Sequence, residues 1–412
     1  MIRRNVTEFV LEALRDTPVV LVHGARQTGK STLVRQIASN EHEAKYVTLD
    51  DLSMLSASQT DPDGFVQSFG GPAVIDEIQR SPDLFRAIKV AVDRDRAPGR
   101  FLLTGSADVL LLPNVSESLA GRMEIVTLWP FSQGEMSGRR ERFVDSLFQK
   151  TLPMLPSSKS DGERDLWCRM ISGGYPEAVA RSATRRKRAW FSAYTTTILK
   201  RDVREIANIE HLAALPRLLS LLAGRTASLL NYSEISRALG MPLSTLKRYM
   251  TLLEMTFLTR TLPAWHSNVG KRIVKAPKLL LTDSGLAAHL LGTWEIDLDT
   301  DRTVLGRLLE NFVAMEIIKQ SSWSDLQPTL HHFRLETGRE VDIVLESASG
   351  KLVGLEVKAA SSVTSGDFKG LRTLAELQPT KFHRGAVMYN GDKIVQFGPN
   401  LHALPIRALW TY

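Results

Sequence analysis

The residues at positions 23–32 decide the fold of this chain, and they read His23-Gly24-Ala25-Arg26-Gln27-Thr28-Gly29-Lys30-Ser31-Thr32. They follow an apolar run at positions 19–22 and lead into a helix-compatible segment at 33–38. The pattern Gly-x-x-x-x-Gly-Lys-Ser between a strand and a helix is that of the phosphate-binding loop (P-loop) of nucleotide hydrolases. The sequence therefore predicts an α/β domain with a nucleotide site near its amino end.

The chemistry of this loop assigns a role to each of its parts. Gly24 and Gly29 let backbone N–H groups turn inward, where they meet phosphate oxygens at a helix N-terminus. Lys30 can reach the β- and γ-phosphates, and the Ser31 hydroxyl can coordinate Mg²⁺. Arg26 either touches phosphate or braces the loop. We expect the nucleotide to be lined as well by the other loop residues, Ala25, Gln27, Thr28 and Thr32.

A second segment, residues 71–77, reads as a short buried strand that ends in Asp76 and Glu77. A P-loop enzyme needs one carboxylate near its Mg²⁺ and one polar group that orients the attacking water. Asp76 fits the first role and Glu77 the second. Alone, such a pair is typical of a strand that ends in solvent. With the P-loop upstream, we interpret it as functional.

Two further features concern the same site. A third strand, residues 101–106, places Thr104 and Ser106 at its carboxyl end, where ligands bind in α/β nucleotide folds. These hydroxyls either contact the nucleotide or simply cap the strand. Arg122 follows Gly121 and is a candidate arginine finger, acting in cis or from a neighbouring subunit. The alternative for Arg122 is an ordinary surface arginine.

Alternating patterns divide the chain into three predicted regions. Residues 1–150 alternate apolar strands with helical stretches, which predicts a mostly parallel sheet with flanking helices. The expected strands are residues 19–23, 46–49, 73–76, 101–103 and 123–128. A stretch rich in Pro, Ser and Gly at 153–162 marks a boundary. Residues 160–265 read as a helical lid with a winged helix, and residues 266–412 as an α/β domain of the restriction-endonuclease type.

The middle region contains the pattern of a helix-turn-helix. Residues 232–239 and 244–254 read as two helices separated by Gly240, with Ser233 and Ser244 as the expected N-caps. The second helix should bury Leu246, Met250 and Leu253 and expose Lys247, Arg248 and Thr251. An extended segment at 257–262 follows as a wing. This layout fits a helix placed in the DNA major groove, and it fits equally an ATPase lid or a protein contact.

The last region carries a second acidic constellation. Residues 340–345 and 352–358 read as neighbouring strands, and alternation places Glu356 and Lys358 on one face, beside Asp342. Two carboxylates near a lysine can hold a divalent metal while the lysine activates water or stabilises charge on phosphorus. The arrangement resembles the core of PD-(D/E)xK nucleases, which implies catalytic roles for Asp342, Glu356 and Lys358. It also implies that Asp342, Glu356 and Glu310 ligate the metal.

Alternatives to a working nuclease site stay open. Glu-x-Lys on a strand is commonly a surface ion pair, and many domains of this fold bind nucleic acid without cutting it. His331 and His332 lack further His or Cys at ligand spacing, so we interpret them as ordinary strand residues.

A wider resemblance covers nearly the whole chain. The P-loop and residues 73–80, 101–106 and 119–122 resemble the bacterial and archaeal AAA-type ATPases of the AAA_14 group, whose usual C-terminal partner is a region called DUF4143. The likeness extends through residues 173–178 and 281–286. It implies binding of ATP and ADP with Mg²⁺, hydrolysis of ATP and a link to DNA. Asp283 matches the family pattern, and its default role is an Asx-type helix cap.

Composition limits the remaining choices. The 412 residues are 43% hydrophobic and 24% charged, which is typical of a soluble protein with an ample core. Cys168 is the single cysteine, so no intrachain disulfide forms and a reducing compartment is favoured. Early charges and the lack of a long apolar run predict neither a signal peptide nor a membrane span, so we expect a cytoplasmic protein. The net charge of +7, with basic residues gathered at 181–188 and 200–204, is compatible with a polyanionic partner.

Three functions agree with these observations. The first is an ATPase that couples its nucleotide state to DNA binding through the winged helix and the nuclease-like region. The second is an ATP-regulated, metal-dependent DNA nuclease. The third is a nucleotide switch that acts on protein partners without DNA. A homo-oligomer is required if Arg122 acts in trans.

Overall fold

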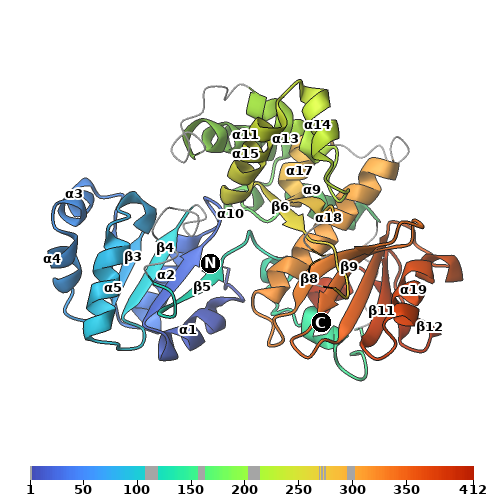
Figure 1. Cartoon of the computed structure of the whole chain (residues 1–412), viewed down its shortest axis with the longest axis horizontal. Helices are drawn as coiled ribbons and strands as arrows, with labels where there is room; N and C mark the ends of the chain where they lie inside the picture. Colours follow the sequence, from blue (N-terminus) through green and yellow to red (C-terminus); the bar gives the residue numbers. More distant parts are fainter. Residues whose placement is uncertain are drawn as a thin grey trace. The chain divides into compact units, whose positions relative to one another are not determined.

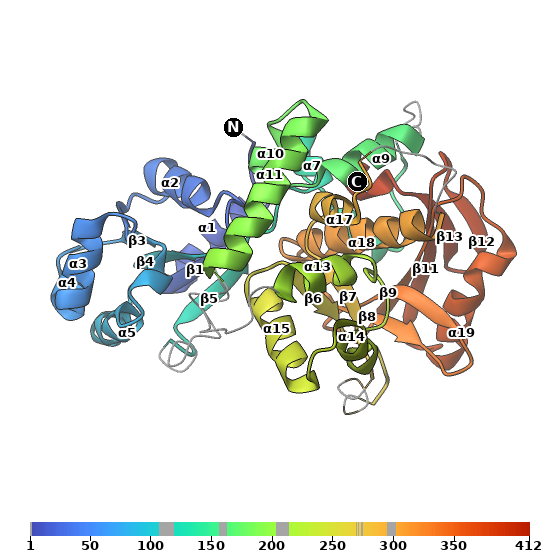
Figure 2. The same cartoon turned by 90° about the horizontal axis from the view of Figure 1, so that it is seen from above.

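The computed structural model describes residues 2–106, 119–155, 163–202, 214–268, 270, 272, 275–294 and 302–412. By its internal contacts the chain forms two compact units, which Figures 1 and 2 colour by sequence. Unit 1 comprises residues 1–130 together with 255–257, and unit 2 comprises residues 131–254 and 258–412. Within the described ranges, no helix has the length and apolar character needed to cross a membrane.

Unit 1 is built on a five-stranded sheet in the order β2-β3-β4-β1-β5, with every neighbouring pair parallel. Its strands are β1 (Val19–His23), β2 (Lys45–Thr48), β3 (Ala73–Asp76), β4 (Phe101–Gly105) and β5 (Met123–Thr127). The helices that accompany the sheet are α1 (Thr7–Asp16), α2 (Lys30–Asn40), α3 (Leu52–Thr60), α4 (Pro62–Gln67) and α5 (Leu84–Arg94) (Figure 1). This is the predicted parallel sheet with flanking helices.

Burial explains why these segments form the sheet. All residues of β1, β3 and β4 are buried, as expected for central strands of a parallel sheet that is covered on both faces. Helix α5 packs against this layer through a stripe of apolar residues, Leu84, Phe85, Ile88 and Val92. The strands agree with the predicted ones to within two residues at each end. The P-loop therefore begins directly after a fully buried strand that is paired on both sides.

Unit 2 contains the helical region, which is folded together with the C-terminal part of the chain. Its helices are α7 (Gln133–Met136), α8 (Phe143–Leu147), α9 (Glu163–Ser172), α10 (Pro176–Val179), α11 (Thr184–Thr197), the π-helix η3 (Ile198–Asp202), α13 (Leu215–Ala223), α14 (Tyr232–Leu239), α15 (Leu243–Met255), α17 (Ser284–Leu291) and α18 (Arg302–Ser321). Helix α17 packs on α9 and α13, while α18 packs on α17 and on the C-terminal sheet.

The compact units do not follow the predicted regions one for one. The chain divides after residue 130 rather than near 150, and the predicted regions 160–265 and 266–412 share one compact unit. The physical reason is that α17 and α18 join the helices to the sheet. Most of the predicted linker at 153–162 lies outside the described residues.

The C-terminal part of unit 2 is a mixed six-stranded sheet in the order β12-β13-β11-β10-β9-β8. Its strands are β8 (Thr329–Arg334), β9 (Glu340–Glu346), β10 (Leu352–Lys358), β11 (Phe382–Tyr389), β12 (Val395–Gly398) and β13 (Leu401–Pro405). Strands β8, β9 and β10 form an antiparallel meander, whereas β10, β11 and β13 run parallel. Helix α19 (Lys369–Leu377) packs on β9, β10 and β11, and the short α20 (Ala408–Thr411) follows β13.

Two helices stand where the sequence predicts a helix-turn-helix. Helix α14 ends at Gly240, whose φ of 62° is left-handed and reverses the chain before α15. Both predicted N-caps are wrong. Asn231 caps α14 by accepting from the Glu234 N–H at 3.1 Å, and α15 begins at Leu243, one residue before Ser244. The predicted extended segment becomes β6 (Thr259–Leu262), which pairs antiparallel with β7 (Lys278–Leu281).

Candidate functional site

The P-loop leaves the carboxyl end of β1 and closes on the first turn of α2. Gly29 has a φ of 94°, a conformation that side chains disfavour, and it is the N-cap of α2. A Cβ at Gly24 would overlap the carbonyl oxygen of Leu128, so only glycine fits there. Gln27 and Thr32 are exposed, whereas Ala25 and Thr28 are buried in the loop and Arg26 is half-buried.

Lys30 lies inside the loop and is almost fully buried. Its Nζ donates to the carbonyl oxygens of Gly24 at 3.0 Å and Ala25 at 2.8 Å. The Thr28 hydroxyl donates to the same Ala25 oxygen at 2.9 Å. Carbonyl oxygens therefore hold the ammonium at the place where phosphate oxygens bind in P-loop proteins.

Arg4 braces the loop from the N-terminal segment, a role that the sequence did not reveal. Its guanidinium donates to the carbonyl oxygen of Thr28 at 3.1 Å and also to that of Trp129. The side chain is buried. In the sequence Arg4 is one of two arginines near the amino end, with no spacing that links it to the loop.

Asp76 meets three hydroxyl groups at the carboxyl edge of the sheet. Ser31 donates to Oδ1 at 3.1 Å, Thr104 donates to the same oxygen, and Tyr46 donates to Oδ2 at 2.7 Å. Burial and the Asp76 carboxylate raise the pKa of Tyr46 to about 12, so this phenol keeps its proton. The structure thus brings Ser31, Asp76 and Thr104 together and adds Tyr46, which lies 30 residues from Asp76 in sequence.

Glu77 turns away from the strand with a left-handed φ of 61°. Its backbone N–H donates to the Thr104 hydroxyl at 2.9 Å, and its carboxylate accepts from the Gln79 amide. The same amide donates to the Ser106 hydroxyl at 2.9 Å. Gln79, in the short helix η1 (Ile78–Arg80), therefore links Glu77 to Ser106, and the pair lies beside Asp76.

Arg122 lies at the end of the sheet where the strands begin, opposite the end that carries the P-loop. Its carbonyl oxygen accepts from the N–H of Val19, the first residue of β1, whereas the P-loop follows the last residue. The four steps from Val19 to His23 separate the two ends of β1 by about 13 Å. The Arg122 Nε also pairs with Asp93 at 2.5 Å. An arginine finger in cis is therefore excluded, because the side chain starts at the wrong end of the sheet.

The residues present fit a magnesium ion. Ser31 and Asp76 offer a hydroxyl and a carboxylate whose oxygens lie 3.1 Å apart, and Mg²⁺ prefers such oxygen ligands with phosphates and water completing its shell. The loop geometry, the buried lysine and this oxygen pair are the parts of an ATP site.

Comparison with known proteins agrees with this arrangement. The family described as "AAA domain" (AAA_14) matches residues 16–137, and two domains of unknown function match residues 163–296 (DUF8612) and 305–409 (DUF4143). The uncharacterized protein Rv2008c of Mycobacterium tuberculosis is 32% identical over 412 residues, which cover 99% of this chain and 85% of that protein. The uncharacterized protein Mb2031c of Mycobacterium bovis gives the same values.

The chain belongs to the AAA_14–DUF4143 family of P-loop ATPases.

Two solved structures show weaker likenesses to this AAA_14–DUF4143 ATPase. The RuvB Holliday junction branch migration motor of Thermotoga maritima is 21% identical, with a TM-score of 0.31 over 62% of this chain and 87% of that one. A signal transduction ATPase with numerous domains from Pyrococcus horikoshii, PH0952, is 13% identical, with a TM-score of 0.26 over 77% and 46% of the two chains. Scores this low carry no inference about function.

The second group of acidic residues of the AAA_14–DUF4143 ATPase, Glu310, Asp342 and Glu356, lies in unit 2. It surrounds a lysine from a strand that the sequence analysis had not linked to it. Lys278, in β7, donates to Glu310 Oε1 at 2.5 Å and to Asp342 Oδ1 at 3.0 Å. Lys358 donates to Glu356 Oε1 at 3.0 Å. Glu310 lies on α18, and the antiparallel pairing of β9 with β10 brings Asp342 beside Glu356, as expected.

Burial shapes the electrostatics of this cluster. It raises the pKa values of Glu310 and Glu356, and the charge of Asp342 raises both further. Burial alone would lower the pKa of Lys278, but Asp342 and Glu310 outweigh it and hold the pKa above its ordinary value. The ammonium of Lys278 therefore stays charged between its two partners.

The histidines near this cluster behave as ordinary strand residues. Burial lowers the pKa of His332 to about 4, and its Nε2 lies 3.1 Å from the carbonyl oxygen of Ala276. Burial also lowers the pKa of His331. Across the described ranges no three His, Cys, Asp or Glu residues are grouped so that they could hold a metal ion.

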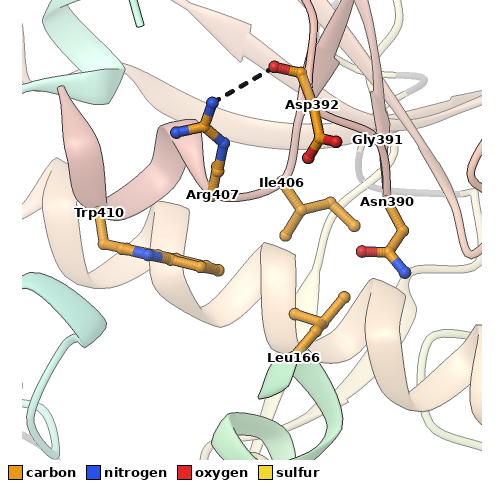
Figure 3. A pocket seen from close by; sticks show the side chains of 7 residues that line it. All are labelled: Leu166, Asn390, Gly391, Asp392, Ile406, Arg407 and Trp410. Carbon is orange, nitrogen blue, oxygen red and sulfur yellow. Dashed lines mark hydrogen bonds between the residues drawn. The ribbon is translucent and has the colours of Figure 1, made fainter. Parts of the chain in front are cut away.

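A small pocket elsewhere in unit 2 contains none of the predicted site residues. Figure 3 shows Arg407, whose guanidinium donates to the carbonyl oxygen of Asp392 at 3.3 Å, beside the Trp410 ring. The pocket is lined by Leu166, Asn390, Gly391, Asp392, Ile406, Arg407 and Trp410. This side chain braces the turn before β12, and the pocket adds nothing to the ATP site.

Proposed function

We propose that this ATPase controls, through its nucleotide state, the binding of double-stranded DNA by α14 and α15. The observation that carries the proposal is the outer face of α15. Leu246, Met250 and Leu253 are buried, as predicted, while Lys247 and Arg248 are exposed beside them. A helix anchored on one side and basic on the other suits the phosphate-lined major groove.

The neighbouring strands support the same reading. Figures 1 and 2 show α14, α15 and β6 grouped in one part of unit 2. Strand β6 begins shortly after α15 and pairs antiparallel with the later strand β7, and we interpret this pair as the wing. Arg237 on α14 and Thr251 on α15 are also exposed. Such residues contact phosphate and sugar in helix-turn-helix proteins.

A second basic surface could add contacts to the DNA backbone. The α11 residues Arg185, Arg186 and Arg188 are exposed, whereas Arg181 pairs with Glu177 at 3.0 Å. Lys187 donates to the Ser172 hydroxyl at 2.9 Å and Lys200 is exposed, whereas Arg204 and the side chain of Arg201 lie outside the described residues.

A physical link between nucleotide and DNA is offered by residues 255–257. These residues join α15 to β6 in sequence, yet by their contacts they belong to unit 1. There the Phe257 ring packs edge-on against His23 at 5.3 Å and against Trp129 at 5.8 Å between ring centroids. His23 immediately precedes Gly24 of the P-loop. A shift of the P-loop on nucleotide binding would therefore move residues 255–257, where α15 ends.

The residues of unit 1 have defined tasks in this scheme. Lys30 exchanges its two carbonyl partners for phosphate oxygens, and Ser31 and Asp76 would hold the Mg²⁺, which supplies charge neutralisation at the phosphates. Glu77, with its Gln79 partner, orients the attacking water. Arg122 would complete the site of a neighbouring copy, which requires a homo-oligomer.

Salt-dependent DNA binding tests the proposal. Each phosphate contact adds roughly 0.9 to the slope of log affinity against log salt. Lys247→Ala/Arg248→Ala should weaken binding of a random-sequence duplex and lower that slope by about 2. The matched control, Lys351→Ala/Lys381→Ala, removes the same charge from exposed positions in the C-terminal sheet domain and should change neither quantity. Equal losses in both variants would refute the assignment to α15.

The coupling needs its own measurement. Duplex affinity of the wild type should differ between ADP and a nonhydrolysable ATP analogue, and Phe257→Ala should remove this difference while ATP still binds. If the wild type binds no duplex even at low salt, the alternative of a nucleotide switch that acts on protein partners is favoured.

A further inference from the structure

The C-terminal acidic centre already contains a cation, the ammonium of Lys278. This group lies between Glu310 Oε1 at 2.5 Å and Asp342 Oδ1 at 3.0 Å, two of the oxygens that the nuclease resemblance assigns to a divalent metal. The side chains of Lys278 and Asp342 are only 6% and 8% exposed. A buried charge of this kind persists because its partners are charged and close.

The fold holds Lys278 in this place. Asn311, the neighbour of Glu310 on α18, accepts from the Leu281 N–H at 2.9 Å and donates to the Leu281 carbonyl oxygen at 3.0 Å. These two bonds fix the end of β7 against α18. Lys278 lies three residues before Leu281 on β7. Because these bonds fix the register of β7 against α18, they also direct Lys278 toward Glu310.

The carboxylate oxygens of the centre are largely committed. Asp342 gives Oδ1 to Lys278 and accepts the Val357 N–H on Oδ2 at 2.9 Å. Glu356 accepts from Lys358 on Oε1, and only its Oε2 is buried without a hydrogen-bond partner. Glu310 commits its Oε1 to Lys278. The two remaining carboxylate oxygens, Glu356 Oε2 and Glu310 Oε2, supply less than half of the roughly six oxygen ligands that a divalent cation takes.

We propose that Lys278 is a built-in cation that replaces the divalent metal of a PD-(D/E)xK-type centre. The ammonium pairs with Asp342, also donates to Glu310, and so ties α18, β7 and β9 together, so the centre needs no metal to fold. It lacks the metal-activated water that nuclease chemistry requires. The predicted roles of Glu310, Asp342 and Glu356 as metal ligands, and of Asp342, Glu356 and Lys358 as catalytic groups, are then vestigial. This inference stands independently of the DNA-binding proposal.

Manganese binding to the nucleotide-free wild type tests the proposal on the folded native protein. Electron paramagnetic resonance counts bound Mn²⁺ directly. The wild type and Asp342→Asn should bind the same amount, because the centre contributes no site. Saturable Mn²⁺ binding that is present in the wild type and lost in Asp342→Asn would overturn the proposal.

Removing the lysine gives the converse test. Lys278→Ala should gain one Mn²⁺ site and a melting temperature that rises with Mn²⁺, and the double variant Lys278→Ala/Asp342→Asn should lose both gains. Lys275→Ala, three residues away and outside the cluster, is the matched control and should gain nothing. A folded Lys278→Ala that binds no additional Mn²⁺ would contradict the proposal, and if that variant does not fold, the wild-type comparison decides.

Discussion

Two buried aspartates in this protein are held in opposite ways. Asp76 in unit 1 accepts hydrogen bonds from three neutral hydroxyls, those of Ser31, Tyr46 and Thr104. Asp342 in unit 2 accepts from the ammonium of Lys278 and from a backbone N–H. Hydroxyls orient a carboxylate without cancelling its charge, so Asp76 still attracts a cation. An ammonium cancels the charge, so Asp342 does not.

The difference separates a site prepared for Mg²⁺ from one that is already complete. Rotating a serine hydroxyl away from a carboxylate costs about one neutral hydrogen bond, roughly 0.5–1.5 kcal/mol. Displacing a buried ammonium breaks a charge pair and leaves buried carboxylates uncompensated, which costs about 3–5 kcal/mol. The same residue type thus serves reversible binding in one unit and permanent structure in the other.

The largest effect is expected when the charge of Lys278, the partner of Asp342, is removed. Lys278→Met keeps the side-chain volume but removes the charge, so the free energy of unfolding of unit 2 should fall by about 3–5 kcal/mol in metal-free buffer. Urea denaturation followed by circular dichroism measures it. Lys275→Met should cost no more than about 0.5 kcal/mol. Equal effects of the two changes would show that Lys278 is not a structural counter-ion.

The ATP site around Asp76 in unit 1 depends on Lys30. Lys30→Ala removes a donor to the phosphates and should lower the rate of ATP hydrolysis by about 100- to 1000-fold, the usual effect of losing one group that stabilises transition-state charge. Phosphate release is the measurement. The exposed Lys45 of the same unit is the control, and Lys45→Ala should keep the wild-type rate. A Lys30→Ala protein as active as the wild type would mean that hydrolysis occurs elsewhere.

A dependence on pH should appear in unit 2. Burial and Asp342 raise the pKa of Glu310 above its ordinary 4.5. The folded protein then holds a proton more tightly than the unfolded chain, so the free energy of unfolding falls as the pH rises above 4.5, by at most about 1.4 kcal/mol per pH unit for one proton. Glu310→Gln should flatten this decline in urea titrations between about pH 5 and 8. An unchanged slope would show that Glu310 is not the group responsible.

The smallest effect concerns Tyr46. Tyr46→Phe removes one hydroxyl from Asp76 and should cost about 1 kcal/mol of stability in unit 1, far less than the loss of Lys278. Because Ser31 and Thr104 still hold the carboxylate, Mg²⁺-dependent ATP binding measured by calorimetry should weaken only a few-fold. A loss as large as that in Lys30→Ala would show that Tyr46 does more than position Asp76.

The residues that sequence reasoning found are those whose geometry is local or set by strand direction. The P-loop spans ten consecutive residues, and Asp76 and Thr104 end neighbouring parallel strands, so their meeting follows from the sheet. Strand direction also excludes Arg122 as an arginine finger within its own chain, because Arg122 immediately precedes β5, at the end of the sheet away from the P-loop. Both predicted N-caps fail because the helices begin a residue or two earlier, a shift that periodicity does not resolve.

The contacts that the sequence left hidden join distant segments. Lys278 lies 32 residues from Glu310 and 64 from Asp342, and it comes from a strand that the sequence assigned no role. Arg4 and Tyr46 reach the ATP site across similar intervals. No spacing rule connects such pairs, because their proximity depends on how β7 packs on α18 and how the N-terminal segment packs on the loop.

One measurement tests the contrast between the two aspartates most directly: a crystal structure with a nonhydrolysable ATP analogue and Mn²⁺, with the metal located by its anomalous scattering. We expect one Mn²⁺ peak, between the phosphates, Ser31 and Asp76, with Lys278 still bound to Glu310 and Asp342. A second peak among Glu310, Asp342 and Glu356 with Lys278 displaced, or no peak beside Asp76, would contradict it.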